Sequence, residues 1–193
     1  MSAASQTGRT SRARGLAWES QLDAYHAQLR AQGRAVIVRV PTAATVIGRT
    51  TQDGRGRTGF RAVWAARTGV DFVGGVHPCG ETCGGAAVPV AIEAKTCTTE
   101  RWDFAAALVA TTAPGPQWLE LEAMHRLDGL ALVLLDWGAH GQWSWGFATL
   151  RGLRSECRAS VSPEDCARYA VRIQGPRWLD AMDAAADAEE VRL

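Results

Sequence analysis

Apolar residues recur along this chain with two different periods. In residues 16–32 the leucines and Tyr25 fall about one helical turn apart, which predicts a helix that Gly33 ends. Short runs of branched residues bounded by glycine or proline predict strands instead. We therefore expect an α/β protein. The expected strands are residues 35–40, 70–73, 88–95, 130–137 and 142–150, and the further helices are residues 102–109, 117–127 and 178–191.

The expected strands at residues 70–73 and 88–95 carry three charged residues. Side chains alternate along a strand, so Glu93 and Lys95 point to one face, and Asp71 joins them if the two strands pair. Two carboxylates and a backbone carbonyl can hold Mg²⁺ or Mn²⁺, which polarises a phosphoryl oxygen and lowers the pKa of a water molecule. A cross-strand salt bridge is the alternative explanation.

The basic residues of the chain favour the metal-site explanation. Lys95 is the only lysine among 21 basic residues, which indicates a position that needs a compact point charge rather than a planar guanidinium. Residues 1–70 carry 11 arginines and three acids, a charge of +8, whereas residues 71–193 carry 10 basic and 17 acidic residues, a charge of −7. A basic first third indicates a polyanionic partner such as DNA.

The arginine-rich residues 43–69 are a long connection for a compact domain and are expected to form a protruding stalk that grips nucleic-acid phosphates. A solvated insertion is the alternative explanation. The candidate DNA-binding residues are Arg14, Arg39, Thr42, Arg49, Arg55, Arg57, Arg61 and Arg67.

The chain has the length and composition of one globular domain. Its 193 residues, 47% of them hydrophobic, suffice for a substantial core. The longest apolar run, residues 130–135, is too short to cross a membrane, and the N-terminus has no apolar signal core. We expect a disordered basic arm at residues 1–14, one domain at residues 15–193, and a cytoplasmic, nucleoid-associated location.

The five cysteines do not predict disulfides, because their number is odd and no secretion signal precedes them. His77, Cys79 and Cys83 have a spacing that could hold zinc, with Cys97 as a further ligand from the next strand. A glycine-rich hairpin without metal explains the same spacing. The chain has no glycine-rich phosphate loop, so no nucleotide cofactor is expected.

Several short motifs follow one another in a recognisable order. They are Gly15-x-x-Trp18-Glu19, Val38-Arg39-Val40-Pro41-Thr42, Thr68-Gly69-Val70-Asp71-Phe72-Val73-Gly74, Ile92-Glu93-Ala94-Lys95-Thr96, Gln117 at a helix start, Gly129-Leu130-Ala131-Leu132-Val133 and Ile173-Gln-Gly-Pro176-Arg177-Trp178-Leu179-Asp180. The acid followed by Glu-x-Lys resembles the PD-(D/E)xK nuclease signature. The whole order, over residues 15–185, resembles the RecU-type Holliday junction resolvases of that superfamily.

The resemblance implies a fold and a set of residue roles. The fold is a restriction-endonuclease-like core, with a mixed central sheet flanked by helices and a protruding basic stalk. Lys95 matches the catalytic lysine, and Gln117 matches a glutamine that helps to position the attacking water. The implied metal ligands are Glu19, Asp71, Glu93 and the carbonyl oxygen of Ala94.

The resemblance also implies an activity. Members of the family act as homodimers, place the stalk in the centre of a four-way DNA junction and cut two opposed strands symmetrically. This chain departs from the family pattern in a longer, cysteine-bearing hairpin before Glu93, and in Pro116, where family members often have histidine. We expect a metal-dependent endonuclease that resolves four-way junctions in DNA recombination and repair. The alternatives are a nuclease of the same fold for other branched, nicked or foreign DNA, and a non-catalytic architectural protein.

Overall fold

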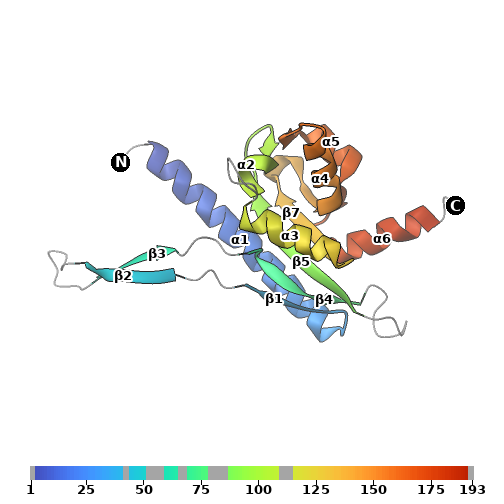
Figure 1. Cartoon of the computed structure of the whole chain (residues 1–193), viewed down its shortest axis with the longest axis horizontal. Helices are drawn as coiled ribbons and strands as arrows, with labels where there is room; N and C mark the ends of the chain where they lie inside the picture. The colour runs from blue at the N-terminus through green and yellow to red at the C-terminus, as the bar shows by residue number, and fades with distance from the viewer. Residues whose placement is uncertain are drawn as a thin grey trace.

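The chain folds into a mixed α/β structure around one large β-sheet (Figure 1). The computed structural model describes residues 3–40, 44–50, 59–64, 69–77, 87–108 and 115–190. The strands are β1 (Ala35–Arg39), β2 (Ala44–Thr50), β3 (Gly59–Trp64), β4 (Phe72–Val76), β5 (Val88–Thr96), β6 (Trp102–Asp103), β7 (Leu130–Asp136), β8 (Gln142–Gly146), β9 (Ser160–Val161) and β10 (Val171–Ile173). The helices are α1 (Ala3–Ala31), α2 (Phe104–Leu108), α3 (Pro116–Arg126), the 3₁₀ helix η2 (Gly138–His140), α4 (Phe147–Ser155), α5 (Pro163–Tyr169) and α6 (Trp178–Glu190).

Across the described residues the large sheet has six strands in the order β1-β4-β5-β7-β8-β10. Strands β5 and β7 run parallel, and the other neighbouring pairs are antiparallel. A parallel pair needs a crossover connection, and α3 lies in the connection between β5 and β7. Helices cover both faces of the sheet (Figure 1). The predicted α/β fold class, a mixed central sheet flanked by helices, is therefore confirmed.

The first face of the sheet is covered by α1 and α6. Helix α1 buries a stripe with helical spacing against the strands, and α6 adds Trp178 and Leu179. The stripe consists of Trp18, Leu22, Tyr25 and Leu29. Helix α1 ends where the sequence predicts, because Gly33 adopts a φ of +68° that favours glycine after a helix.

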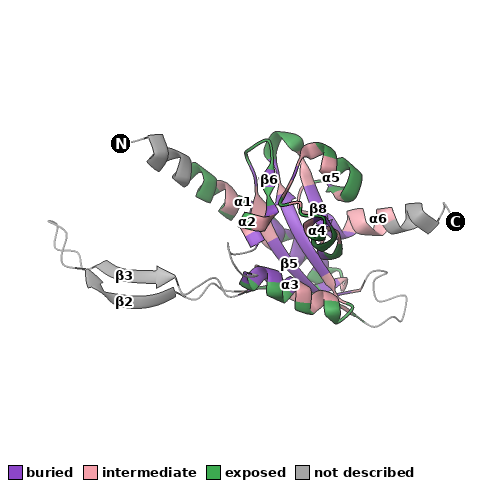
Figure 2. Ribbon diagram, turned by 45° about the horizontal axis from the view of Figure 1, so that its top comes forward, coloured by how far each residue is buried: buried purple, intermediate pink, exposed green. Residues whose placement is uncertain are grey.

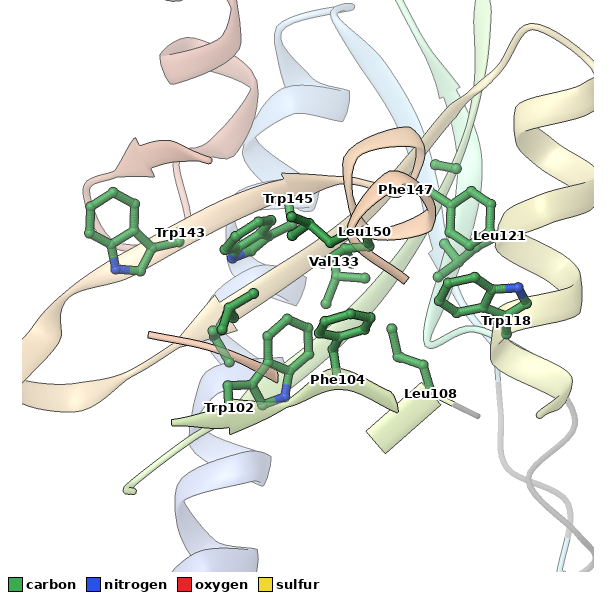
Figure 3. Packing of buried hydrophobic residues seen from close by; sticks show 14 of the residues in the cluster. Trp102, Phe104, Leu108, Trp118, Leu121, Val133, Trp143, Trp145, Phe147 and Leu150 are labelled. Atoms are coloured by element: carbon green, nitrogen blue, oxygen red, sulfur yellow. The ribbon is translucent and has the colours of Figure 1, made fainter. Parts of the chain in front are cut away.

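The second face is covered by α2, α3 and α4, and it is rich in aromatic residues. Figure 3 shows side chains from these helices gathered around Val133 of β7. The rings of Trp118 and Phe147 meet edge to face with their centroids 4.8 Å apart, a favourable arrangement for aromatic pairs. Figure 2 shows that the middle of β5, which runs between the two layers, is buried.

Strands β2 and β3 form a separate two-stranded sheet that extends away from the large one (Figure 1). Their antiparallel register is shifted between Val46 and Gly48. Both strands fall inside residues 43–69, the segment expected to be the stalk. Residues 43, 51–58 and 65–68 of that segment lie outside the described residues, so its role as a stalk stays a prediction.

Some elements differ from the sequence prediction. Helix α1 begins at Ala3, whereas the sequence analysis expects a disordered arm up to Arg14. Residues 147–150, predicted as strand, were assigned wrongly: the chain turns at Gly146 and α4 begins, because Phe147, Leu150 and Leu153 are spaced to bury one helical face.

Further short elements follow α4. Strand β10 forms an edge of the large sheet, and β9 pairs with β6. Ser162 and Asp165 form a reciprocal capping box at the beginning of α5. In the part of the chain that the structure describes, every helix is too short or too polar to cross a membrane.

Candidate functional site

The pairing of β4 with β5 brings the predicted acids together. Phe72 lies opposite Ile92, so Asp71, one residue before β4, continues the register to a position opposite Glu93. Ala91 lies opposite Val73, and both belong to the face that α3 covers. Because side chains alternate along a strand, Asp71, Glu93 and Lys95 share that face. The predicted pairing is confirmed, although the strand begins one residue after Asp71 rather than before it.

Asp71 is held by hydrogen bonds on both sides, although it is not part of a strand. Its Oδ2 accepts a hydrogen bond of 2.9 Å from the backbone N–H of Ala94 on β5. Its carbonyl oxygen accepts one of 2.8 Å from the N–H of Val40, which follows β1. The Asp71 side chain is therefore fixed beside the residue whose carbonyl is the expected backbone ligand.

Glu93 and Lys95 form an ion pair in the interior of the protein. The Nζ of Lys95 donates to the Oε1 of Glu93. The Glu93 side chain is 1% exposed and that of Lys95 is 12% exposed. Moving two charges out of water costs several kcal/mol each, so a buried pair of this kind is weak evidence of a stabilising role. The pair lies within β5 and is not the cross-strand salt bridge considered as the alternative explanation, and it does not exclude metal binding.

Gln117 lies in the first turn of α3, as the sequence predicts. Pro116 occupies the first helical position, where its missing N–H has no cost, and Gly115 precedes it in an extended conformation. Gln117 is 6% exposed, and α3 packs on β5 and β7. An amide buried on this helix lies in the layer that covers the face of Asp71 and Glu93.

Glu19 occupies a different environment from the other predicted ligands. It lies on α1, which packs on the opposite face of the sheet, and its carboxylate forms an ion pair with Arg39 of β1. Arg39 also contacts Asp23, with 3.2 Å between Nη1 and Oδ2. In the described ranges, no group of three or more His, Cys, Asp or Glu side chains is arranged to hold a metal ion. The structure brings Asp71 and Glu93 together without Glu19.

Two of the candidate DNA-binding arginines form ion pairs. Arg39 binds Glu19 and Asp23, and Arg14 of α1 contacts Asp136 at the end of β7, with 3.2 Å between Nε and Oδ2. Arg49 and Arg61 belong to β2 and β3. Thr42, Arg55, Arg57 and Arg67 lie outside the described residues.

The zinc hypothesis falls mostly on residues that the structure does not describe. Cys79 and Cys83 lie outside the described ranges. Cys97, the suggested further ligand, is buried, and its Sγ lies 3.3 Å from the hydroxyl oxygen of Thr99. Zinc binding by this segment stays a prediction.

One residue near the site was not found by sequence reasoning. Glu120 of α3 accepts a hydrogen bond of 2.9 Å through Oε2 from the backbone N–H of Val70, the residue before Asp71. The two residues are 50 positions apart, and a surface glutamate in a helix is unremarkable by itself. Glu120 follows Gln117 by three positions, and residues at this spacing are neighbours on a helix surface. This spacing is the sequence signal that could have placed Glu120 near the site.

Comparison with known proteins finds a likeness among solved structures and none among sequences. No family model and no curated protein matches the sequence. Among solved structures, the chain is similar to Hjc, a Holliday junction resolvase from the archaeal hyperthermophile Archaeoglobus fulgidus. The two are 14% identical with a TM-score of 0.45, over 82% of this chain and 95% of that chain. Because identity and TM-score are this low, no residue's role is transferred from the likeness.

Proposed function

We propose that this protein is a divalent-metal-dependent endonuclease that resolves four-way DNA junctions as a homodimer of the RecU type. The observation that carries the proposal is the register of β4 and β5, which sets Asp71 opposite Glu93 and beside Lys95. Two carboxylates and a lysine on one face of a sheet suit phosphodiester hydrolysis. The order of motifs along the chain supports the finer assignment to junction resolution.

The donor atoms at this position fit Mg²⁺ or Mn²⁺. Both ions prefer oxygen ligands, and Mg²⁺ usually retains several of its waters, so Asp71, Glu93 and the Ala94 carbonyl are a sufficient protein set. Glu19 is paired with Arg39 and lies on α1, on the opposite face of the sheet, so it is not part of this set. When bound, the metal neutralises charge on the phosphate and lowers the pKa of a water molecule.

The chain's own residues provide charge and orientation. The Lys95 ammonium compensates Glu93 in the interior, and it has three N–H donors with which to contact a phosphate oxygen or the attacking water. Gln117 can both donate to and accept from a water molecule, because its amide has an N–H₂ group and a carbonyl. Asp71 keeps its orientation through the Ala94 N–H.

DNA binding is assigned mainly to the basic residues 43–69. Arg14 and Arg39 would have to give up their ion pairs with Asp136 and Glu19 before contacting DNA. Phosphate contacts position a protein on DNA without specifying sequence, so we propose recognition by the shape of the junction. The two active sites of a homodimer would then cut opposed strands symmetrically.

The proposal is tested by cleavage of a synthetic mobile four-way junction, with Mg²⁺ or with EDTA, beside a linear duplex of matched sequence. We expect paired symmetrical nicks that require Mg²⁺. The Asp71→Asn variant is expected to bind the junction and cut nothing, because one metal ligand has lost its charge. Asp128→Asn is the matched control, since Asp128 is exposed at a φ of 55° that asparagine tolerates.

Three outcomes would contradict parts of the proposal. Normal cutting by Asp71→Asn would remove Asp71 from the site. Equal cutting of duplex and junction at one salt concentration would indicate a nuclease with another target. Junction binding without cleavage in any divalent ion would indicate an architectural protein.

A further inference from the structure

We propose that Glu120 is a positioning residue that sets the metal ligand Asp71 in place through the backbone before it; this rests on the function proposed above. The Oε2 of Glu120 accepts the N–H of Val70 at 2.9 Å. Val70 is 2% exposed and packs in the core of the α3 face. A backbone N–H buried there without an acceptor costs about 1–3 kcal/mol, and the Glu120 carboxylate avoids that cost by accepting its hydrogen bond.

The residue before Val70 is adapted to the same carboxylate. Gly69 has a φ of +96°, a conformation that side chains rarely adopt. A Cβ at this position would lie 2.7 Å from each of the two carboxylate oxygens of Glu120. The backbone conformation therefore favours glycine at residue 69, and a Cβ there would displace the Glu120 carboxylate from its position.

The consequence for Asp71 follows from its place in the chain. Asp71 precedes β4, so the ladder of sheet hydrogen bonds does not fix it. Its anchors are the Val40 N–H on its carbonyl, the Ala94 N–H on its side chain, and the Glu120 carboxylate on the preceding peptide. Hydrogen bonds to a charged acceptor are about twice as strong as neutral ones, which favours Glu120 as the strongest of the backbone anchors.

Glu120 also links two parts of the proposed site. It is three residues after Gln117 on α3, and residues at this spacing are neighbours on a helix surface. A single rigid helix thus carries the buried amide and fixes the segment that carries Asp71. We infer that the orientation of α3 sets the relation between these two groups.

The experiment uses the full chain and the variants E120A and E120Q, with E122A as the control. Glu122 lies on the same helix, and its Oε1 pairs with Nη2 of Arg126 at the surface, at 3.0 Å. Three quantities are measured: Mn²⁺ affinity by calorimetry without DNA, exchange of the Val70 amide hydrogen by NMR, and junction cleavage. Mn²⁺ alone is the probe of the metal site.

We expect E120A to weaken Mn²⁺ binding by about 10- to 100-fold, the usual effect of removing a group that orients a metal ligand, and to speed exchange of the Val70 amide. E120Q keeps an acceptor oxygen without the charge, so its Val70 exchange and Mn²⁺ affinity should fall between wild type and E120A. E122A should behave as wild type. A purely structural role would lower thermal stability without changing Mn²⁺ affinity in the folded protein.

The outcomes separate this inference from the proposed function. Wild-type Mn²⁺ affinity and Val70 exchange in a folded E120A would overturn the inference. If E120A does not fold, E120Q decides, and wild-type Val70 exchange in E120Q would overturn it. A wild-type protein that neither binds Mn²⁺ nor cuts DNA would instead overturn the proposed function.

Discussion

The two faces of the large sheet differ in where they keep their charged groups. On the face covered by α1 and α6, ion pairs lie at the rim. The pairs Arg14–Asp136, Arg34–Asp180 and Arg39–Glu19 all have side chains that are partly exposed. On the face covered by α3, Glu93 and Lys95 form a pair whose side chains are 1% and 12% exposed. Only the second arrangement carries the full cost of desolvating two charges.

The first face buries an uncharged polar side chain. His26 of α1 is 3% exposed, accepts a hydrogen bond of 3.2 Å from Trp178 through Nε2, and meets the ring of Phe72 edge to face. Burial lowers the pKa of His26 to about 4, so the ring is neutral near pH 7. The comparison teaches that the first face buries a neutral side chain, whereas the second face buries two charges at a cost that their mutual attraction need not offset. Such a pair is the arrangement expected of a site kept for function, and the variants below test this.

The largest expected effect comes from breaking the buried pair. Replacement of Lys95 alone, as in Lys95→Met, leaves the Glu93 charge buried without its partner and should lower the free energy of unfolding by about 3–5 kcal/mol. The double variant Glu93→Gln/Lys95→Met removes both charges and should regain most of that loss. Neither variant should cleave a junction. Urea unfolding with EDTA present and single-turnover cleavage measure the two properties separately.

The double variant is the decisive member of this set. Restored stability with no cleavage would mean that the pair is kept for function. If the double variant were as unstable as the single one, the charges would be structural, and the contrast between the two faces would fail. The control is Arg126→Ala, which removes an exposed arginine of α3 and should leave both the free energy of unfolding and the cleavage rate close to wild type.

The next effect concerns His26 and the pH dependence of stability. The folded pKa of about 4 lies below the ordinary value of 6.5, so the unfolded chain binds a proton that the folded protein rejects. This contribution to stability is present above pH 6.5 and is lost as the pH falls toward 4. Between pH 7.5 and 5 the loss should be about 2 kcal/mol in the free energy of unfolding.

The variant His26→Leu isolates this contribution. It should lose the pH-dependent part of its stability over this interval, as measured by urea unfolding at both pH values. The depressed pKa values of Asp165 and Asp180 affect stability only at lower pH, as those carboxylates become protonated. An unchanged dependence in His26→Leu would show that another group is responsible.

Local patterns in the sequence sufficed for the elements closest to the site. The strand predicted at residues 88–95 is Val88–Thr96 in the structure, because alternation and flanking glycines are local signals. The same alternation places Glu93 and Lys95 on one face. The position of Asp71 required the additional assumption that β4 and β5 pair, which the register bears out.

Other features depended on contacts that no local pattern contains. The hydrogen bond from the Val70 N–H to the Glu120 carboxylate joins the residues just before β4 to helix α3, 50 positions along the chain. The pairing of Glu19 with Arg39 depends on how α1 lies against β1. The turn into α4 at Gly146 was missed because the alternation of Trp143 and Trp145 continues by chance to Phe147, although Phe147, Leu150 and Leu153 have helical spacing.

The smallest expected effect lies at the rim of the α1 face. Arg34 reaches Asp180 and Asp183 of α6, with 2.6 Å to an oxygen of each carboxylate, and so fastens α6 to the segment between α1 and β1.

These side chains are between 25% and 33% exposed, and solvent screening limits such pairs to about 1 kcal/mol. Arg34→Ala should therefore cost about 1 kcal/mol of unfolding free energy and leave cleavage unchanged, because Arg34 and its partners on α6 lie on the opposite side of the sheet from Asp71 and Glu93. The matched control is Arg126→Ala, whose pair with Glu122 is more exposed and should contribute about 0.3–0.5 kcal/mol. A loss in Arg34→Ala as large as that in Lys95→Met, or a fall in cleavage, would mean that the two faces do not divide structural and functional charges in this way.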